Sequence, residues 1–295
     1  MANFLKNRVA VITGSGQGVG RAIAMAMAKE GAKLVTNNRW QGTPGGDAET
    51  TAREIIDIGG EAVPFFGDVS DFEVARKLVQ TAVDNFGGID ILVNNAGITG
   101  RRSVVWDLTE EDWYRCIDIS LKGSFNCIRH ASGLMRQQGW GRIVNTTSVS
   151  ALGVRDNCQY SAAKAGIIGL TKAVACDLGE YGTTCNCYVP TTRTRMSSGE
   201  ERDAYYRKMY EKGLLTREQY EEQTTQSGPE RAAAPLVAYL CTDEAGNING
   251  RVFRVKWGIV YVYSEPGEKK SISKEEGPWT IEELIQLVPN VLLEG

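Results

Sequence analysis

The chain of 295 residues is 42% hydrophobic and 23% charged, with a formal net charge of −3. This composition is that of an ordinary globular protein, and it argues against a disordered chain, a membrane protein or a nucleic-acid-binding surface. The N-terminal residues lack the apolar core of a signal peptide, so we expect a soluble, cytoplasmic protein without membrane or nucleic-acid partners.

Cysteine and histidine usage narrows the chemistry further. The seven cysteines are odd in number and include no Cys-x-x-Cys pair, so we expect free thiols rather than a disulfide framework. His130 is the only histidine, which removes the usual ligand spacing of a structural zinc site and argues against a Ser-His-Asp hydrolase. We therefore expect no bound metal.

Strand-like and helix-like segments alternate along the chain. Short apolar runs bounded by turn residues predict strands, at about 8–13, 33–37, 62–66, 89–93, 142–146, 184–189 and 252–256. Helix formers with start and stop signals predict helices, at about 19–30, 48–58, 70–86, 109–135, 160–178, 232–240 and 280–287. Because βαβ units build a parallel sheet with helices on both faces, we predict an α/β fold with a doubly wound, Rossmann-like sheet and a ligand site at the carboxyl ends of its strands.

The regular alternation stops after Pro190. Residues 191–226 are polar and are typical of two short helices with a break at Gly213. A long segment at this place in a sheet favours a lid over the site, at about 196–226, whereas a surface excursion or a subunit contact is the alternative. Its expected substrate contacts are Met196, Tyr205, Tyr206 and Tyr210. The chain then divides into a catalytic domain, 1–264, and a C-terminal extension, 265–295, with a short helix.

A glycine-rich segment between the first strand and the first helix is the first motif with chemical meaning. It reads Thr13-Gly14-Ser15-Gly16-Gln17-Gly18-Val19-Gly20. Glycines let the backbone approach a phosphate closely, and a helix N-terminus offers it free N–H groups. A plain turn is the alternative, but the position after the first strand favours a dinucleotide site. The expected contacts are Gly14, Ser15, Gln17, Gly18, Val19 and Gly20.

The end of the second strand is expected to meet the adenosine ribose of such a cofactor. It reads Thr36-Asn37-Asn38-Arg39 and lacks the acidic residue that binds both ribose hydroxyls of NAD. Beside the uncharged Asn38, Arg39 is suited to pair with a 2′-phosphate, which favours NADP(H) while NAD(H) stays possible. A solvated loop cation is the alternative for Arg39. After the fourth strand, the sequence Asn94-Asn95-Ala96-Gly97 suits either a backbone beside the cofactor or a simple turn.

Tyr160 and Lys164 are the reactive candidates. Residues four apart share one helix face, and a neighbouring ammonium lowers the pKa of a phenol. Tyr160 is therefore expected to exchange a proton near neutrality. Ser148, at the end of the fifth strand, carries a hydroxyl that can bond to a substrate oxygen.

The order of these motifs resembles that of the short-chain dehydrogenase/reductase family, over about residues 6–260. The spacing Gly14-x-x-x-Gly18-x-Gly20 is similar to the compact branch rather than the extended epimerase branch. The resemblance implies hydride transfer with NAD or NADP, Tyr160 as acid/base, Lys164 on the nicotinamide ribose and Ser148 on the carbonyl oxygen. It also implies cofactor contacts from Asp68, Val69, Asn95, Ala96, Gly97, Tyr160, Lys164, Val189 and Thr194.

Two positions depart from the family pattern. Ser120 stands where many members carry the asparagine that anchors a proton-relay water, so Ser120 becomes the expected fourth catalytic residue. Pro190-Thr191 replaces the family's Pro-Gly after the sixth strand, which alters the loop that leads to Thr194. The family commonly pairs its long helices across a two-fold axis, so a homo-oligomer, most often a tetramer, is expected.

Three segments of the C-terminal half, 190–196, 234–237 and 249–253, further resemble the hydroxyacyl-CoA dehydrogenase part of the peroxisomal multifunctional β-oxidation enzyme and its bacterial relatives. We therefore expect an enzyme that interconverts a secondary alcohol and a ketone on a bulky cyclic, polycyclic or hydroxyacyl-CoA-like substrate. One alternative is a non-catalytic dinucleotide-sensing protein, which any NAD(P)-linked turnover would exclude. The other is a lyase or epimerase, which a net redox change of the cofactor would exclude.

Overall fold

An eight-stranded sheet forms the centre of the fold, in the order β3-β2-β1-β4-β5-β6-β7-β8. All neighbouring strands are parallel except β7 and β8, which form an antiparallel pair. The strands are β1 (Val9–Ile12), β2 (Lys33–Asn38), β3 (Glu61–Phe66), β4 (Ile91–Asn94), β5 (Gly141–Thr146), β6 (Thr183–Thr191), β7 (Val252–Lys256) and β8 (Ile259–Val262). The strand order reverses between β1 and β4, which is where open sheets of this kind bind ligands.

The computed structural model describes residues 3–192, 200–224, 228–275 and 277–293. Contacts divide the chain into two units, Met1–Val262 and Tyr263–Gly295. The helices of the first unit are α1 (Gly18–Lys29), α2 (Ala48–Asp57), α3 (Phe72–Phe86), α4 (Glu110–Ile117), α5 (Gly123–Gln138), α6 (Cys158–Gly179), α7 (Glu200–Glu211), α8 (Arg217–Thr224) and α9 (Ala234–Leu240).

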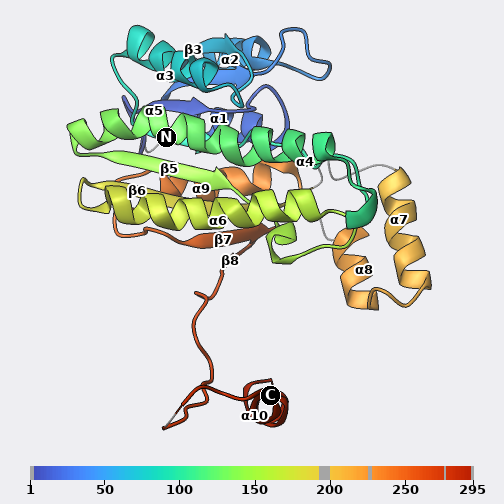
Figure 1. The fold of residues 1–295 in the computed structure, drawn as a ribbon. Coiled ribbons are helices and arrows are strands. Elements are labelled where there is room, and N and C mark those ends of the chain that lie inside the picture. The colour runs from blue at the N-terminus through green and yellow to red at the C-terminus, as the bar shows by residue number, and fades with distance from the viewer. Residues whose placement is uncertain (1–2, 193–199, 225–227, 276, 294–295) are drawn as a thin grey trace. The chain divides into compact units, whose positions relative to one another are not determined.

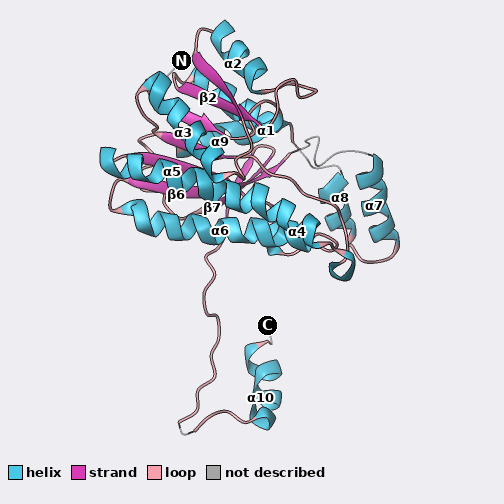
Figure 2. Cartoon of the chain, turned by 45° about the horizontal axis from the view of Figure 1, so that its top comes forward, coloured by secondary structure: helices cyan, strands magenta, loops and turns pink. Residues whose placement is uncertain are grey.

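Helices cover the sheet on both faces (Figure 1). Successive side chains of a strand point to opposite faces, and β1 shows this directly. Ala10 and Ile12 join one buried apolar cluster with α1 and α9, whereas Val9 and Val11 join a second cluster with α3, α5 and α6. Figure 2 shows the same helices layered against the sheet from another side. The predicted doubly wound α/β fold is therefore confirmed.

Two elements differ from the sequence-based expectation. The helix expected over 109–135 is interrupted by a π turn, Asp118–Lys122, between α4 and α5. The edge strand β8 was not expected, because all four of its residues are exposed and give no buried pattern. Trp257 and Gly258, both at positive φ (23° and 76°), form the two-residue connection that folds β8 back onto β7.

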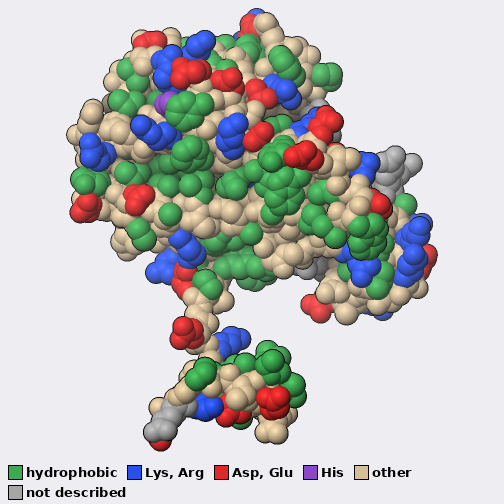
Figure 3. Space-filling model, in the orientation of Figure 1, with side chains coloured by type: hydrophobic (Ala, Val, Ile, Leu, Met, Phe, Trp, Pro, Cys, Tyr) green, Lys and Arg blue, Asp and Glu red, His purple; other side chains and the backbone are tan. Residues whose placement is uncertain are grey.

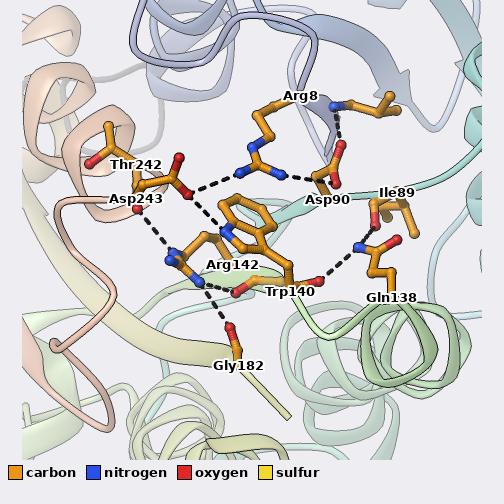
Figure 4. A network of polar contacts seen from close by, with 11 residues as sticks. Arg8, Ile89, Asp90, Gln138, Trp140, Arg142, Gly182, Thr242 and Asp243 are labelled. Carbon is orange, nitrogen blue, oxygen red and sulfur yellow. Dashed lines mark hydrogen bonds and ion pairs between the residues drawn. The ribbon is translucent and has the colours of Figure 1, made fainter.

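A polar network closes the amino edge of the sheet (Figure 4). The ring of Trp140 lies between the guanidinium groups of Arg8 and Arg142, whose carbons are 3.6 and 4.3 Å from ring centroids. Asp243 accepts hydrogen bonds from Trp140 (2.8 Å) and Arg8 (2.9 Å). The buried Arg142 donates to the carbonyl oxygens of Thr242, Gly141 and Gly182, at 3.1, 2.8 and 3.1 Å. Gly141 and Arg142 begin β5, and the other residues precede a strand or follow α9, so the network joins β1, β5, β6 and α9 at the edge opposite the site.

The second unit contains the helix α10 (Ile281–Leu287), at the place where a short helix is predicted. Thr280 and Glu283 form a reciprocal capping box at its start, and the ammonium of Lys274 lies 2.7 Å from Glu283. In the described part of the chain, no helix is both long and apolar enough to cross a membrane.

Replacing Arg142 tests how much the amino-edge network stabilises the sheet. Arg142→Met removes a buried cation that donates hydrogen bonds to three carbonyl groups. A buried carbonyl oxygen that loses its hydrogen-bond donor typically lowers the free energy of unfolding by about 1–3 kcal/mol. We expect a loss of about 2–4 kcal/mol in the free energy of unfolding, measured by urea titration. The control Arg53→Gln alters an arginine side chain that is 73% exposed and is expected to change it by less than about 1 kcal/mol. Equal losses in both variants would contradict this role.

Candidate active site

Several positions in the loop after β1 favour glycine over any other residue. Gly14 and Gly18 have φ of +64° and +63°, a backbone conformation that other residues rarely adopt. A Cβ on Gly20 would lie 2.4 Å from the carbonyl oxygen of Gly14. The side chain of Gln17, the residue before α1, makes no capping hydrogen bond. The N–H groups of the first turn of α1 therefore lack the side-chain partner that commonly caps a helix, which suits an anion.

A cavity of about 380 Å³ extends from this loop across the carboxyl edge of the sheet. The predicted site residues that line it are Gly14, Gln17, Gly18, Val19, Gly20, Asn38, Asn95, Ala96, Gly97, Ser148, Tyr160, Lys164 and Tyr206. The predicted residues that do not line it are Ser15, Arg39, Asp68, Val69, Ser120, Val189, Tyr205 and Tyr210. Thr194 and Met196 lie outside the described residues.

The end of β4 is fastened to the glycine loop. Asn95 donates from Nδ2 to the carbonyl oxygens of Thr13 and Gly14, at 3.0 Å each. Ser15 is fully buried and its hydroxyl donates to the Ile12 carbonyl (2.8 Å) while it accepts from the Asn37 N–H (2.9 Å). The Ser15 side chain therefore holds the loop from behind. Its backbone is occupied as well, because its N–H donates to the Asn37 carbonyl and its carbonyl accepts from the Thr51 hydroxyl, at 2.9 Å each.

Ser148, Tyr160 and Lys164 meet at the cavity from two elements. Ser148 follows β5 and its hydroxyl accepts from the Ser150 N–H at 3.2 Å. Tyr160 and Lys164 come from the first turns of α6, and a hydrogen bond joins the Tyr160 and Ser148 side chains. The Lys164 ammonium donates to the carbonyl oxygen of Thr146 at 2.7 Å and lies 5.6 Å from the Tyr160 ring centroid.

Burial dominates the protonation of this group. It raises the pKa of Tyr160 to about 12, and the hydrogen bond to Ser148, which acts in the opposite direction, is the smaller influence. Burial also lowers the pKa of Lys164 to about 8. The expectation that Lys164 brings the Tyr160 pKa towards neutrality is therefore wrong for this structure, because removing both groups from water disfavours both charged forms.

Ser120 lies in the π turn and is buried. Its hydroxyl donates to the Ile98 carbonyl at 3.4 Å and accepts from the Ile98 N–H at 3.3 Å. A Cβ on Gly97 would lie 3.3 Å from this hydroxyl and 3.4 Å from the Lys164 ammonium. The visible role of Ser120 is thus to hold the turn after β4 beside Lys164.

Next to Asn38, two residues that were expected to bind different parts of a cofactor pair with each other outside the cavity lining. Arg39 Nε lies 3.0 Å from an Asp68 carboxylate oxygen, and the Arg39 guanidinium carbon lies 4.9 Å from the Trp40 ring centroid. Asn38 lines the cavity, but its buried Oδ1 has no hydrogen-bond partner among the described residues. Val69 and Val189 are buried within the fold.

Helix α7 reaches the cavity through Tyr206, which is 8% exposed. Tyr205 donates from its hydroxyl to Asp156 at 2.8 Å, beside the cavity rather than in its lining. Tyr210 stacks on Tyr220 of α8, with ring centroids 5.1 Å apart. The three tyrosines predicted to contact a substrate therefore make three different kinds of contact.

The cavity also contains charged residues that the sequence interpretation missed, namely Arg102, Glu230 and Arg254. Arg102 and Arg254 could have been expected from the sequence, because ligands bind near the carboxyl ends of parallel strands. Arg102 lies in the loop after β4, and Arg254 lies in β7, the last parallel strand. Glu230 comes from a short turn before α9, and its Oε1 is 3.3 Å from the position of a Cβ on Gly18. No sequence spacing pointed to Glu230, since it approaches the glycine loop only through the fold.

Comparisons with known proteins agree on one family. The model of the short chain dehydrogenase family matches residues 8–204. The chain is 39% identical over 241 residues to peroxisomal multifunctional enzyme type 2 of Drosophila melanogaster, across 79% of this chain and 36% of that enzyme. The chain therefore spans only about a third of that relative.

Other relatives are matched along nearly their whole length. The 3-oxoacyl-[acyl-carrier-protein] reductase of Synechocystis sp. is 37% identical over 262 residues, which cover 87% of this chain and 98% of the reductase. The crystal structure of a short chain dehydrogenase from Mycobacterium avium superposes with a TM-score of 0.81 at 34% identity, over 98% of this chain and 95% of that chain.

The buried Lys164 predicts a specific pH dependence of stability. Its pKa falls from 10.5 to about 8 on folding, so the unfolded state binds more protons between these values and stability rises with pH across this window. Relative to Lys164→Met, the wild type is expected to gain about 2 kcal/mol between pH 7 and pH 10. Urea unfolding of both proteins at several pH values measures this difference. The contributions of the other titrating groups are the same in both proteins and cancel. A difference that stays constant with pH would contradict the shift.

Proposed function

The chain belongs to the short-chain dehydrogenase family, and we propose that it interconverts a secondary alcohol and a ketone at the cavity that contains Ser148, Tyr160 and Lys164. Its relatives are named as dehydrogenases and reductases, and membership implies an NAD(P)-dependent oxidoreductase that acts on CH–OH groups. The observation that carries the proposal is that these three side chains and the glycine loop line one and the same cavity.

The residues present fit a dinucleotide. Gly16 and Gly20 leave no room for a side chain, α1 begins without a side-chain cap, and Asn38 lines the cavity with an unsatisfied buried oxygen. We propose that the glycine loop holds the pyrophosphate, with Asn95, Ala96 and Gly97 beside it. When bound, NAD(P)(H) supplies or accepts the hydride.

The side chains of this protein then handle the proton and the substrate oxygen. At neutral pH Tyr160 is protonated, because its pKa is raised to about 12, and it is set to donate its proton to an oxygen that gains negative charge during reduction. Ser148, which lies beside Tyr160, turns its hydroxyl proton to that oxygen and donates a second hydrogen bond to it. Lys164 is placed beside Tyr160 to bind the nicotinamide ribose, and Ser120 supports the backbone turn next to it. In the oxidative direction Tyr160 first loses its own proton to solvent, and the phenolate then accepts the hydroxyl proton of the alcohol.

We propose NADP(H) as the preferred cofactor, with Asp68, Val69 and Val189 placed along the cofactor path. Arg39 supports this preference because it is about half exposed, with 48% of its side chain accessible, at the end of β2. A 2′-phosphate there would compete with Asp68 for the guanidinium group.

The proposed substrate is bulky and cyclic, polycyclic or acyl-thioester-like. By their names, the relatives include enzymes that act on carrier-bound 3-oxoacyl groups and on a phenyl-substituted succinyl-CoA. Helix α7 is proposed as the lid that covers this substrate, because Tyr206 closes one wall of the cavity and Tyr205 joins α7 to the segment before α6.

We further propose a homo-oligomer, most often a tetramer, formed through α4, α5 and α6. Hydrophobic side chains gather on this face of the molecule (Figure 3). They include Trp113, Tyr114 and Phe125, which are 37%, 54% and 45% exposed. Sedimentation at micromolar concentration tests this assembly, and a monomer alone would rule it out.

Replacing Tyr160 tests the proton-transfer step. Tyr160→Phe keeps the ring and removes the hydroxyl, so we expect turnover to fall by about 10²–10⁴-fold while the affinity for NADPH is unchanged. A panel of ketones with NADPH, and of alcohols with NADP⁺, followed at 340 nm, measures turnover. The matched control is Tyr239→Phe, an exposed tyrosine outside the cavity, which should keep full activity. Near-normal rates in Tyr160→Phe would remove Tyr160 from the mechanism.

Replacing Arg39 tests the choice of cofactor. Arg39→Ala is expected to raise KM for NADP(H) about tenfold or more and to leave KM for NAD(H) unchanged, because only the former carries the 2′-phosphate. Arg53→Ala, a surface arginine on α2, serves as the control. A wild-type enzyme that strongly prefers NAD(H) would show that the uncharged Asn37 or Asn38 binds the ribose instead.

A further inference from the structure

Arg102 is held in place by the same segment that leads into Tyr160. The residue before it, Arg101, accepts a hydrogen bond at its carbonyl from Gln159 Nε2 (2.8 Å). The residue after it, Ser103, donates its N–H to the Asp156 carbonyl (3.0 Å). Both backbone neighbours of Arg102 are therefore tied to residues one and four positions before Tyr160, which fixes the Arg102 backbone relative to the proposed reaction centre.

Two tyrosines of α7 surround the guanidinium group of Arg102. It donates to the Tyr206 hydroxyl at 3.3 Å, and its central carbon lies 4.9 and 5.6 Å from the ring centroids of Tyr205 and Tyr206. Tyr205 is itself anchored by Asp156. Aromatic faces of this kind orient a guanidinium group without neutralising it.

The charge of Arg102 has no acidic partner among the residues that the structure describes. Arg101, next to it, pairs with Asp112 at 3.5 Å, but no described carboxylate forms an ion pair with Arg102. Among the described residues, the charged ones that line the cavity are three basic, Arg102, Lys164 and Arg254, and one acidic, Glu230. The acidic one, Glu230, lies against Gly18 at the glycine loop and not beside Arg102. The excess of positive charge therefore suits anionic ligands.

From this arrangement we propose that Arg102 binds a negatively charged oxygen group of the substrate, a carboxylate or a phosphate, so that the enzyme prefers anionic ketones and alcohols to neutral ones of the same shape. Planar guanidinium groups bind these anions through two parallel N–H bonds. Arg102 and its two neighbours contact residues of 99–112, 156–159 and α7, whereas the glycine loop is surrounded by Asn38, Asp47, Asn95 and Glu230. The site thus serves the substrate half of the cavity, and the inference rests on the function proposed above.

Binding of simple anions to the full chain tests this site without any redox step. The probes are cyclohexanecarboxylate, its neutral isostere cyclohexanecarboxamide, and cyclohexyl phosphate, titrated in the presence of saturating NADP⁺ and followed by ligand-detected NMR. We expect at least one anion to bind about tenfold tighter than the amide, and Arg102→Gln to abolish that preference. Whichever anion binds more tightly shows whether the site prefers a carboxylate or a phosphate.

The matched control is Arg101→Gln, which removes the same charge from the adjacent position outside the cavity and is expected to keep the preference. Arg102→Lys should retain part of it through its charge, and Tyr206→Phe should weaken it by a few-fold through loss of one hydrogen bond. Equal loss in the Arg101 and Arg102 variants, or no preference of the wild type for either anion, overturns the proposal. Weaker NADP⁺ binding in Arg102→Gln also overturns it, since Arg102 would then serve the cofactor.

Turnover separates this proposal from the proposed function. With 3-oxocyclohexanecarboxylate and NADPH, Arg102→Gln should raise KM about tenfold or more and leave kcat nearly unchanged, as expected for a residue that binds substrate away from the reacting atoms. If neutral ketones are reduced and Arg102→Gln changes nothing, Arg102 has no such role and the oxidoreductase stands. If the anions bind through Arg102 but no ketone or alcohol is turned over, the binding site stands and the proposed reaction fails.

Discussion

The site depends on one steric constraint, the close packing of the β1–α1 turn against the end of β4. A Cβ on Gly20 would lie 2.4 Å from the Gly14 carbonyl oxygen and 2.5 Å from Asn95 Nδ2, so no other residue leaves these two segments in contact. Asn95 uses this closeness to bond the carbonyl groups of Thr13 and Gly14. The same contact aims the N-terminus of α1 into the cavity and places the turn at Gly97 next to Lys164.

Around this turn, burial determines how the polar groups behave. Tyr160 and Lys164 have opposite charges when ionised. Removal from water nevertheless raises the pKa of Tyr160 and lowers that of Lys164, and both shifts favour the neutral form. Lys164 donates a hydrogen bond to the Thr146 carbonyl, which it can do in either protonation state. In the proposed mechanism, the protonated Tyr160 beside Lys164 donates the proton without a third, acidic group.

Much of this architecture could be predicted from the sequence because it is local. The buried strands β1 and β4 are short apolar runs, and β5 has the apolar pair Ile143-Val144 at its centre. The glycine loop and the pair Tyr160 and Lys164 are fixed by spacing within one turn or one helix. What could not be predicted arises from contacts across the fold. The pairing of Arg39 with Asp68 joins two loops, the approach of Glu230 to Gly18 crosses most of the chain, and the pKa of Tyr160 follows from burial that no sequence pattern reports. Similarly, all four residues of β8 are exposed, so the apolar run Ile259–Val262 does not mark a buried strand.

The amino-edge network of Arg8, Trp140, Arg142 and Asp243 affects which sequence changes this fold can accumulate during evolution. It secures strands of only four to nine residues at the edge away from the cavity, so the cohesion of the sheet does not rely on the loops at the other edge. Substitutions, insertions and deletions in those loops and in α7 can therefore accumulate without loss of the folded state. An enzyme whose stability and substrate binding depend on opposite edges of the sheet can acquire new substrates by changes at one edge alone. A library of variants confined to 99–108, 149–157 and α7 would therefore vary substrate specificity while the fold stays intact.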